Sequence, residues 1–147
     1  MARDEIHDSS VLIKILHSPD RYGEAFFRSI EAGRAWLSSV VVAELYAGSR
    51  SPGDSRWIDR IVRAMKADGR LLTPTHDDWA IAARLIARYI RNRGKIVPRD
   101  HLADALIVIS ASQVGGTVLT YNVGHMETWA ALARASRRDV TVAEYAP

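Results

Sequence analysis

The stretch that decides the fold is Ile6-His7-Asp8-Ser9-Ser10-Val11-Leu12-Ile13. Ile6 and His7 precede a polar turn, and a largely apolar stretch over residues 11–16 follows it. Asp and Ser favour helix N-termini because their side-chain oxygens accept hydrogen bonds from the free N–H groups of the first turn. The stretch therefore predicts a short strand that ends at His7 and passes into a helix, with Asp8 at the junction.

Short strands and helices alternate along the rest of the chain. We expect further strands at residues 35–37, 71–72, 118–120 and 140–142. We expect further helices at residues 20–31, from Ser38 or Ser39 to Gly48, around 57–65, from Thr75 to Gly94, at 100–113 and at 128–135. This alternation predicts an α/β fold, a three-layer α/β/α sandwich with a short-stranded, mainly parallel sheet. At 147 residues the chain has the size of one domain, so we expect a single domain over 1–147.

The composition narrows the class of protein. A chain with 48% hydrophobic and 25% charged residues has the balance of a folded globular protein and not that of a disordered one. The absence of cysteine excludes disulfides and thiolate metal sites. No apolar run approaches the ~18 residues that cross a bilayer, and the first residues lack a signal-peptide pattern, so we expect a cytoplasmic protein without membrane contact. The net charge of +3 favours an anionic partner such as nucleic acid.

Three carboxylates lie in or beside apolar sequence, where an ionised group is costly to bury. These are Asp8, Glu44 and Asp104. A carboxylate in such a setting either becomes neutral or is held by a cation and hydrogen-bond donors. Asp8 follows the first expected strand, and Glu44 and Asp104 fall near the starts of two expected helices, so all three can converge at one end of a parallel sheet. Oxygen ligands select a hard ion such as Mg²⁺ or Mn²⁺, which can activate water for attack on a phosphodiester.

The chain lacks the sequence signatures of several competing enzyme classes. The chain contains no Gly-rich phosphate loop of the Walker type. It also contains neither a His-Glu-x-x-His metalloprotease motif nor a Gly-x-Ser-x-Gly nucleophile elbow. Metal-dependent phosphodiester hydrolysis is the enzyme class that the carboxylates favour.

The chain resembles the PIN-domain family, and in particular the VapC-type toxins of bacterial toxin–antitoxin pairs. Four blocks of sequence carry the resemblance, and their order and spacing cover nearly the whole chain. The blocks are Asp8-Ser9-Ser10-Val11-Leu12-Ile13, Ser39-Val40-Val41-Val42-Ala43-Glu44-Leu45-Tyr46-Ala47-Gly48, Asp104-Ala105-Leu106-Ile107 and Leu119-Thr120-Tyr121-Asn122-Val123-Gly124-His125-Met126. In the fourth block His125 and Met126 stand where the family has an Asp-Phe pair. His7 is also unusual, since the first strand of the family is normally apolar there.

The resemblance implies a Mg²⁺- or Mn²⁺-dependent endoribonuclease that cleaves RNA and is held inactive by a cognate antitoxin. It also implies a homodimer. By position, the metal ligands and catalytic residues would be Asp8, Glu44 and Asp104, with three supporting polar side chains. The supporting residues would be Ser10, Thr120 and Asn122. Because the fourth acid is replaced by His125, the alternative is a catalytically impaired PIN-like module that binds RNA or a protein partner.

Structural explanations of the same residues remain open from the sequence alone. Asp8 and Ser10 are also common helix caps, and Glu44 fits a partly exposed position on a helix with an apolar face. An arginine stripe on the expected helix from Thr75 to Gly94 can contact RNA phosphates or simply face solvent; it consists of Arg84, Arg88 and Arg91. Trp57, Trp79 and Trp129 fit a core or a dimer surface better than base stacking.

Overall fold

The sheet at the centre of the molecule has five parallel strands. The structure is a computed structural model that describes residues 2–147. In sheet order the strands are β3 (Leu71–Leu72), β2 (Ala35–Ser38), β1 (Glu5–His7), β4 (Thr117–Thr120) and β5 (Thr141–Glu144). The central strand β1 pairs with β2 through Ile6 and Trp36, and with β4 through Ile6 and Val118. All strands therefore end at the same edge, where their last residues can meet.

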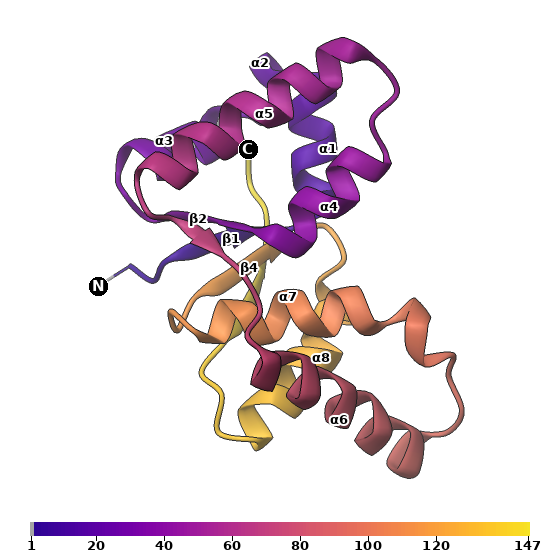
Figure 1. Cartoon of the computed structure of the whole chain (residues 1–147). Helices are drawn as coiled ribbons and strands as arrows, with labels where there is room; N and C mark the ends of the chain where they lie inside the picture. The colour runs from indigo at the N-terminus through magenta and orange to yellow at the C-terminus, as the bar shows by residue number, and fades with distance from the viewer. Residues whose placement is uncertain (1) are drawn as a thin grey trace.

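Helices cover both faces of this sheet (Figure 1). One side carries α1 (Ser9–His17), α2 (Pro19–Tyr22), α3 (Glu24–Glu31), α4 (Ser39–Ala47) and α5 (Pro52–Ala67). The other side carries α6 (His76–Arg93), α7 (Leu102–Ser112) and α8 (Val123–Ala135), with a 3₁₀ turn at Pro98–Asp100 before α7. The expected α/β fold is confirmed, with three layers and a sheet that is entirely parallel.

Local hydrogen bonds explain where the principal helices begin. The Asp8 side chain accepts from the Ser9 N–H at the start of α1, as the junction pattern predicts. Ser38 caps α4 in the same way, through the N–H groups of Val40 and Val41. Thr75 and Asp78 form a reciprocal capping box at the start of α6. The core lies between these helices and the sheet, and Ile6 at its centre is fully buried.

Some sequence predictions were wrong in detail. The helix expected over residues 20–31 is two helices, α2 and α3, that meet at Gly23. A Cβ atom at Gly23 would lie 2.6 Å from the Pro19 carbonyl oxygen, so this tight junction requires glycine. The helix expected from Asp100 begins at Leu102 with His101 as its N-cap, and Asp100 lies in the 3₁₀ turn.

Two further differences concern the candidate site. Glu44 lies in the second half of α4 and not near its start, because the helix begins at Ser39. The helix expected over residues 128–135 begins already at Val123, which places His125 in its first turn. Across residues 2–147, no helix combines the length and the hydropathy that crossing a membrane requires.

Candidate active site

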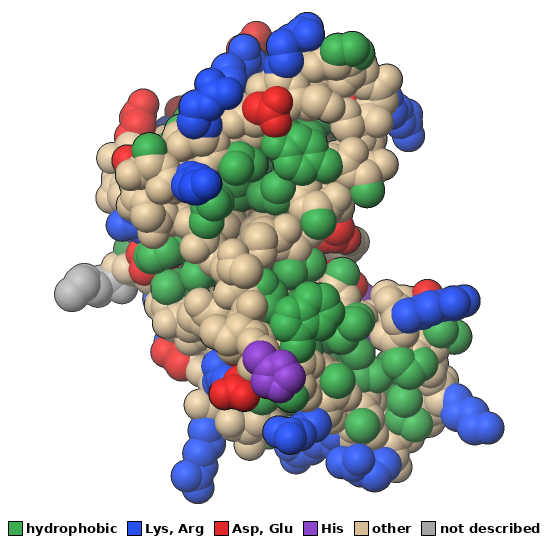
Figure 2. Space-filling model, viewed as in Figure 1, with side chains coloured by type: hydrophobic (Ala, Val, Ile, Leu, Met, Phe, Trp, Pro, Cys, Tyr) green, Lys and Arg blue, Asp and Glu red, His purple; other side chains and the backbone are tan. Residues whose placement is uncertain are grey.

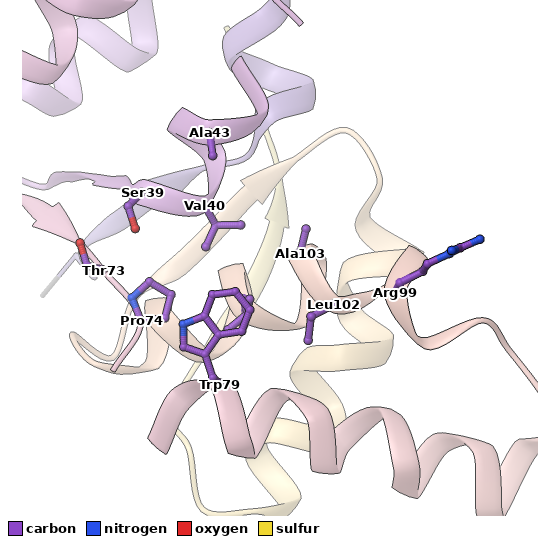
Figure 3. A pocket seen from close by; sticks show the side chains of 10 residues that line it. Ser39, Val40, Ala43, Thr73, Pro74, Trp79, Arg99, Leu102 and Ala103 are labelled. Carbon is purple, nitrogen blue, oxygen red and sulfur yellow. The ribbon is translucent and has the colours of Figure 1, made fainter. Parts of the chain in front are cut away.

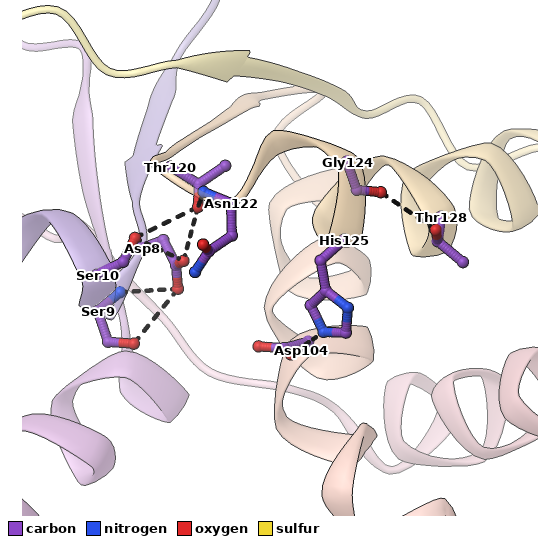
Figure 4. Close-up of polar contacts among 9 residues, drawn as sticks. All are labelled: Asp8, Ser9, Ser10, Asp104, Thr120, Asn122, Gly124, His125 and Thr128. Atoms are coloured by element: carbon purple, nitrogen blue, oxygen red, sulfur yellow. Dashed lines mark hydrogen bonds and ion pairs between the residues drawn. The ribbon is translucent and has the colours of Figure 1, made fainter. Parts of the chain in front are cut away.

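Asp8 is held at the carboxyl end of β1 by a set of hydroxyl groups. It is only 4% exposed, and its Oδ1 atom accepts from the Ser9 N–H at 2.8 Å. Its Oδ2 atom accepts from the hydroxyls of Ser10 at 3.1 Å and Thr120 at 2.9 Å (Figure 4). Thr120 ends the neighbouring strand β4, so adjacent parallel strands bring together residues 112 positions apart. These hydrogen bonds offset the cost of burying the polar side chain of Asp8.

Glu44 faces the same region from α4 and carries an unsatisfied oxygen. Its Oε1 atom is buried and has no hydrogen-bond partner. Burial, followed by the negative charges of Asp8 and Asp104, raises the pKa of Glu44 to about 7, while the Ser9 side chain opposes the shift. Glu44 therefore lies close enough to Asp8 and to Asp104 to be repelled by both, and a cation bound beside Glu44 would offset this repulsion.

Asp104 reaches this region from the first turn of α7, and His125 of α8 contacts it directly. The His125 Nε2 atom lies 2.6 Å from the Asp104 Oδ2 atom (Figure 4). Both side chains are partly exposed, at 44% for His125 and 26% for Asp104. The His125 ring lies near the rings of His101 and Trp129, with centroid distances of 5.6 and 6.5 Å. His125 thus holds one oxygen of the third carboxylate.

The predicted site residues take distinct places around this edge of the sheet. Ser10 and Thr120 bond the Asp8 carboxylate and lie 3.3 Å from each other. Asn122 contributes its backbone N–H to the Thr120 hydroxyl at 2.9 Å. The role of Asp8, Glu44 and Asp104 as catalytic metal ligands stays a prediction.

A family comparison identifies the fold. The sequence pattern of the PIN domain matches residues 6–134. The chain belongs to the PIN domain family.

Solved structures agree with this PIN fold. The chain is similar to one in "Structure of FitAB bound to IR36 DNA fragment", with 19% identity, a TM-score of 0.63, and coverage of 95% of this chain and 94% of the other. It is also similar to a chain of a DNA-bound VapBC from Salmonella typhimurium, with 18% identity, a TM-score of 0.64 and coverage of 98% and 99%. FitAcB from Neisseria gonorrhoeae gives 23% identity, a TM-score of 0.64 and coverage of 94% and 95%. No curated protein matches the chain in sequence.

The residues of this PIN domain fit a hard divalent cation. The donors are carboxylate oxygens, and the buried Glu44 Oε1 atom has no other partner. Among residues 2–147, no three His, Asp or Glu side chains form a metal-binding group by themselves. Mg²⁺ nevertheless usually keeps several waters and binds through only one or two carboxylates, so a complete protein cage is not required. The chemistry of the donors is therefore compatible with a partly hydrated ion near Glu44.

Sequence reasoning missed several residues around the carboxylates. His101 lies three positions before Asp104 on one helical turn, and its buried Nδ1 atom has no hydrogen-bond partner. The i, i+3 spacing is a signal that could have found it. Lys14 follows Ser10 by four positions on α1, and Tyr121 follows Thr120. Nothing in the sequence places Lys14 and Tyr121 next to each other, because their contact depends on how α1 packs against β4.

Proposed function

We propose that this PIN domain is a divalent-metal-dependent endoribonuclease and the toxin of a toxin–antitoxin pair. The observation that carries the proposal is the buried, unpartnered oxygen of Glu44 beside two further carboxylates at the carboxyl edge of a PIN-fold sheet. Asp8, Glu44 and Asp104 would hold Mg²⁺ or Mn²⁺. When bound, such an ion lowers the pKa of a water and stabilises the charge that develops on the phosphate.

The protein's own groups prepare the site for this ion. The hydroxyls of Ser10 and Thr120 hold the Asp8 carboxylate in a fixed orientation, from which it would bind the ion. Burial and the charges of Asp8 and Asp104 raise the pKa of Glu44 to about 7, so near neutral pH its deprotonation and ion binding are coupled. His125 fixes Asp104 through a single hydrogen bond, which leaves the other Asp104 oxygen free to bind an ion.

The proposal is tested with the full-length, antitoxin-free protein and a labelled single-stranded RNA. We expect cleavage with added Mg²⁺ or Mn²⁺, none with EDTA, and a loss of at least about 100-fold in Asp8→Asn and Asp104→Asn. Glu31→Gln, an exposed carboxylate at the end of α3, is the matched control and should retain activity. Circular dichroism verifies that each variant is folded. Cleavage by the wild type that survives chelation would rule out the mechanism.

A specific observation favours the second candidate function, a PIN-like module that binds RNA or a protein without cleaving. His125 occupies the position of the family's fourth acid and bonds Asp104. Calorimetric titration with Mn²⁺ separates the two functions. No detectable binding of a divalent ion, together with intact RNA affinity, would support the binding module and not the nuclease.

An exposed apolar surface supports a homodimer. Trp129 is core, but Trp79 on α6 is 49% exposed and borders a hollow of about 440 Å³ between α4 and the α6–α7 pair. Pro74, Val40 and Leu102 line the same hollow (Figure 3), and hydrophobic side chains gather on this face (Figure 2). Patches of this kind on a soluble protein mark interaction surfaces. We expect Trp79→Lys to shift a dimer to monomer in analytical ultracentrifugation, and a wild type that is monomeric at micromolar concentration would contradict the dimer.

A second hollow favours the antitoxin as the partner at the site itself. Ile13 and Leu16 of α1 and Leu45 of α4 line a hollow of about 160 Å³ that also includes Glu44. Ile13 is 41% exposed, so the hollow presents an apolar surface next to Glu44. An antitoxin segment that buries these side chains would cover Glu44. Ile13→Asp should then weaken complex formation in a pull-down with the co-expressed antitoxin, whereas unchanged capture would exclude this hollow.

A further inference from the structure

Two exposed basic side chains and two partly buried tyrosines lie together next to the Asp8 network. We call it the tyrosine patch and define it by Lys14, Arg21, Tyr22 and Tyr121. The Lys14 Nζ atom lies 4.3 Å from the ring centroid of Tyr121 and 5.5 Å from that of Tyr22. The Arg21 Cζ atom lies 5.2 Å from the Tyr22 centroid. Two cations therefore share two neighbouring aromatic rings.

The patch is joined to the candidate active site by hydrogen bonds. The Tyr121 N–H donates to the Ser10 Oγ atom at 3.3 Å, and the Ser10 hydroxyl in turn donates to the Asp8 Oδ2 atom at 3.1 Å. Ser10 and Lys14 are four residues apart on α1, so they lie on the same face of that helix. A nucleic-acid strand with one phosphate at the carboxylates would therefore have its adjacent nucleotide near the patch.

A buried tyrosine fixes the geometry of the patch. Tyr145 is 3% exposed, and its ring packs edge-on against Tyr121 with a centroid distance of 5.9 Å. Its hydroxyl donates to the Tyr22 carbonyl oxygen at 2.5 Å and accepts from the Phe26 N–H at 3.2 Å. The rigid support lies beneath the patch, whereas Lys14 and Arg21 are exposed. Within residues 2–147 neither cation forms an ion pair with a carboxylate, so both are available to an anionic ligand.

We propose that the tyrosine patch is a subsite for one nucleotide of single-stranded RNA, adjacent to the phosphodiester at the carboxylates. This inference rests on the proposed function, since it names how the same site holds its substrate. A base stacks on the Tyr121 ring, and Lys14 and Arg21 neutralise the flanking phosphates. The contact between Lys14 and Tyr121 is weak at an exposed position, so a base can replace the ammonium group on the ring while the lysine turns to a phosphate.

Nearby charges favour one side of the Tyr121 ring for the sugar–phosphate backbone. Glu144 is exposed at the end of β5, which pairs with β4 next to Tyr121. Burial and the neighbouring Tyr22 and Glu144 raise the pKa of Tyr121. A phosphate on the Glu144 side of the ring would meet a like charge, whereas the α1 side offers Lys14. The sugar–phosphate backbone is therefore expected to follow α1, with the base turned towards β5.

The test measures RNA affinity in a protein that cannot cleave. Full-length Glu44→Gln protein is titrated against a fluorescently labelled single-stranded RNA, with anisotropy as the readout. In this background Tyr121→Leu should weaken binding about 5- to 10-fold, at the low end for a stacked base because the ring is partly buried. Tyr121→Phe keeps the ring and should bind like the parent. Lys14→Gln should lower the slope of log K against log salt by about 0.7.

A matched control and a second ligand keep the test specific. Lys66→Gln removes an exposed lysine in the last turn of α5, shortly before the start of β3, and should leave the RNA affinity unchanged. Double-stranded RNA, whose bases are not free to stack, should show no difference between Tyr121→Leu and Tyr121→Phe. Equal affinities of these two variants for single-stranded RNA would overturn the subsite, as would a parent protein that binds no RNA. A wild-type protein that binds RNA through the patch but never cleaves it would refute the nuclease and leave the subsite standing.

Discussion

Replacing Glu44 by Gln should stabilise the metal-free protein at pH 8. Burial and the charges of Asp8 and Asp104 raise the pKa of Glu44 from 4.5 to about 7. A raised carboxyl pKa contributes stability that is present below pH 4.5 and is lost as the pH rises through 7, where the folded protein must ionise the group. The full shift corresponds to about 3 kcal/mol, and because the group is partly exposed, solvent screening reduces the expected gain to about 1–2 kcal/mol.

The assay is urea unfolding of the wild type and Glu44→Gln in EDTA at pH 5 and pH 8. The difference in free energy of unfolding should grow in favour of the variant from pH 5 to pH 8, because only the wild type ionises at this position. Added Mg²⁺ should reverse the order, stabilising the wild type by about 2.7 kcal/mol at 100 times its dissociation constant and the variant by less. Glu31→Gln should show neither effect. A variant that is no more stable than the wild type at pH 8 without metal would refute the repulsion among the three carboxylates.

Three further predictions concern buried or crowded positions. Burial lowers the pKa of His7 to about 3, so the free energy of unfolding falls as the pH drops from 6.5 towards 3. In the urea assay the wild type should lose about 2 kcal/mol at pH 5 relative to pH 7.5. His7→Phe should not show this loss. A Cβ atom at Gly116 would lie 2.4 Å from the Ile6 Cδ1 atom, so Gly116→Ala should lower the free energy of unfolding by about 1–3 kcal/mol. Gly124 has open space around it, so Gly124→Ala should not lower it. Equal stabilities of the two variants would contradict the packing at Gly116. His125→Asp replaces the imidazole beside Asp104 with a carboxylate and should increase Mg²⁺ affinity in calorimetry while lowering the melting temperature without metal; weaker Mg²⁺ binding would argue against an ion at Asp104.

The features that were predicted best from the sequence are those that depend on local hydrogen bonding. The strand-to-helix junction at Asp8 and the caps at Ser38 and Thr75 follow from residue type and spacing, and the structure confirms them. The division of the predicted helix at Gly23 was missed, because it depends on the close approach of Pro19 and Phe27 to Gly23, which the residue types alone do not reveal.

The missed parts of the candidate site depend on packing between distant segments. The segment before Thr128 contains Gly124 and lacks a side-chain cap, so its helical propensity is low. It is helical because Met126 is 1% exposed and packs in the core, and this packing outweighs propensity. The contact of His125 with Asp104 joins α7 and α8 across 21 residues, and no spacing rule of a single helix predicts it.

The hydrogen bond between Asp8 and Thr120 also determines how late during synthesis the Asp8 network can form. It joins the first strand to the fourth across 112 residues, so a ribosome must have made most of the polypeptide before the Asp8 network can close. At a synthesis rate of about 5–20 residues per second, that separation alone takes roughly 6–20 seconds. A partly translated chain therefore lacks the completed network until β4 has been synthesised.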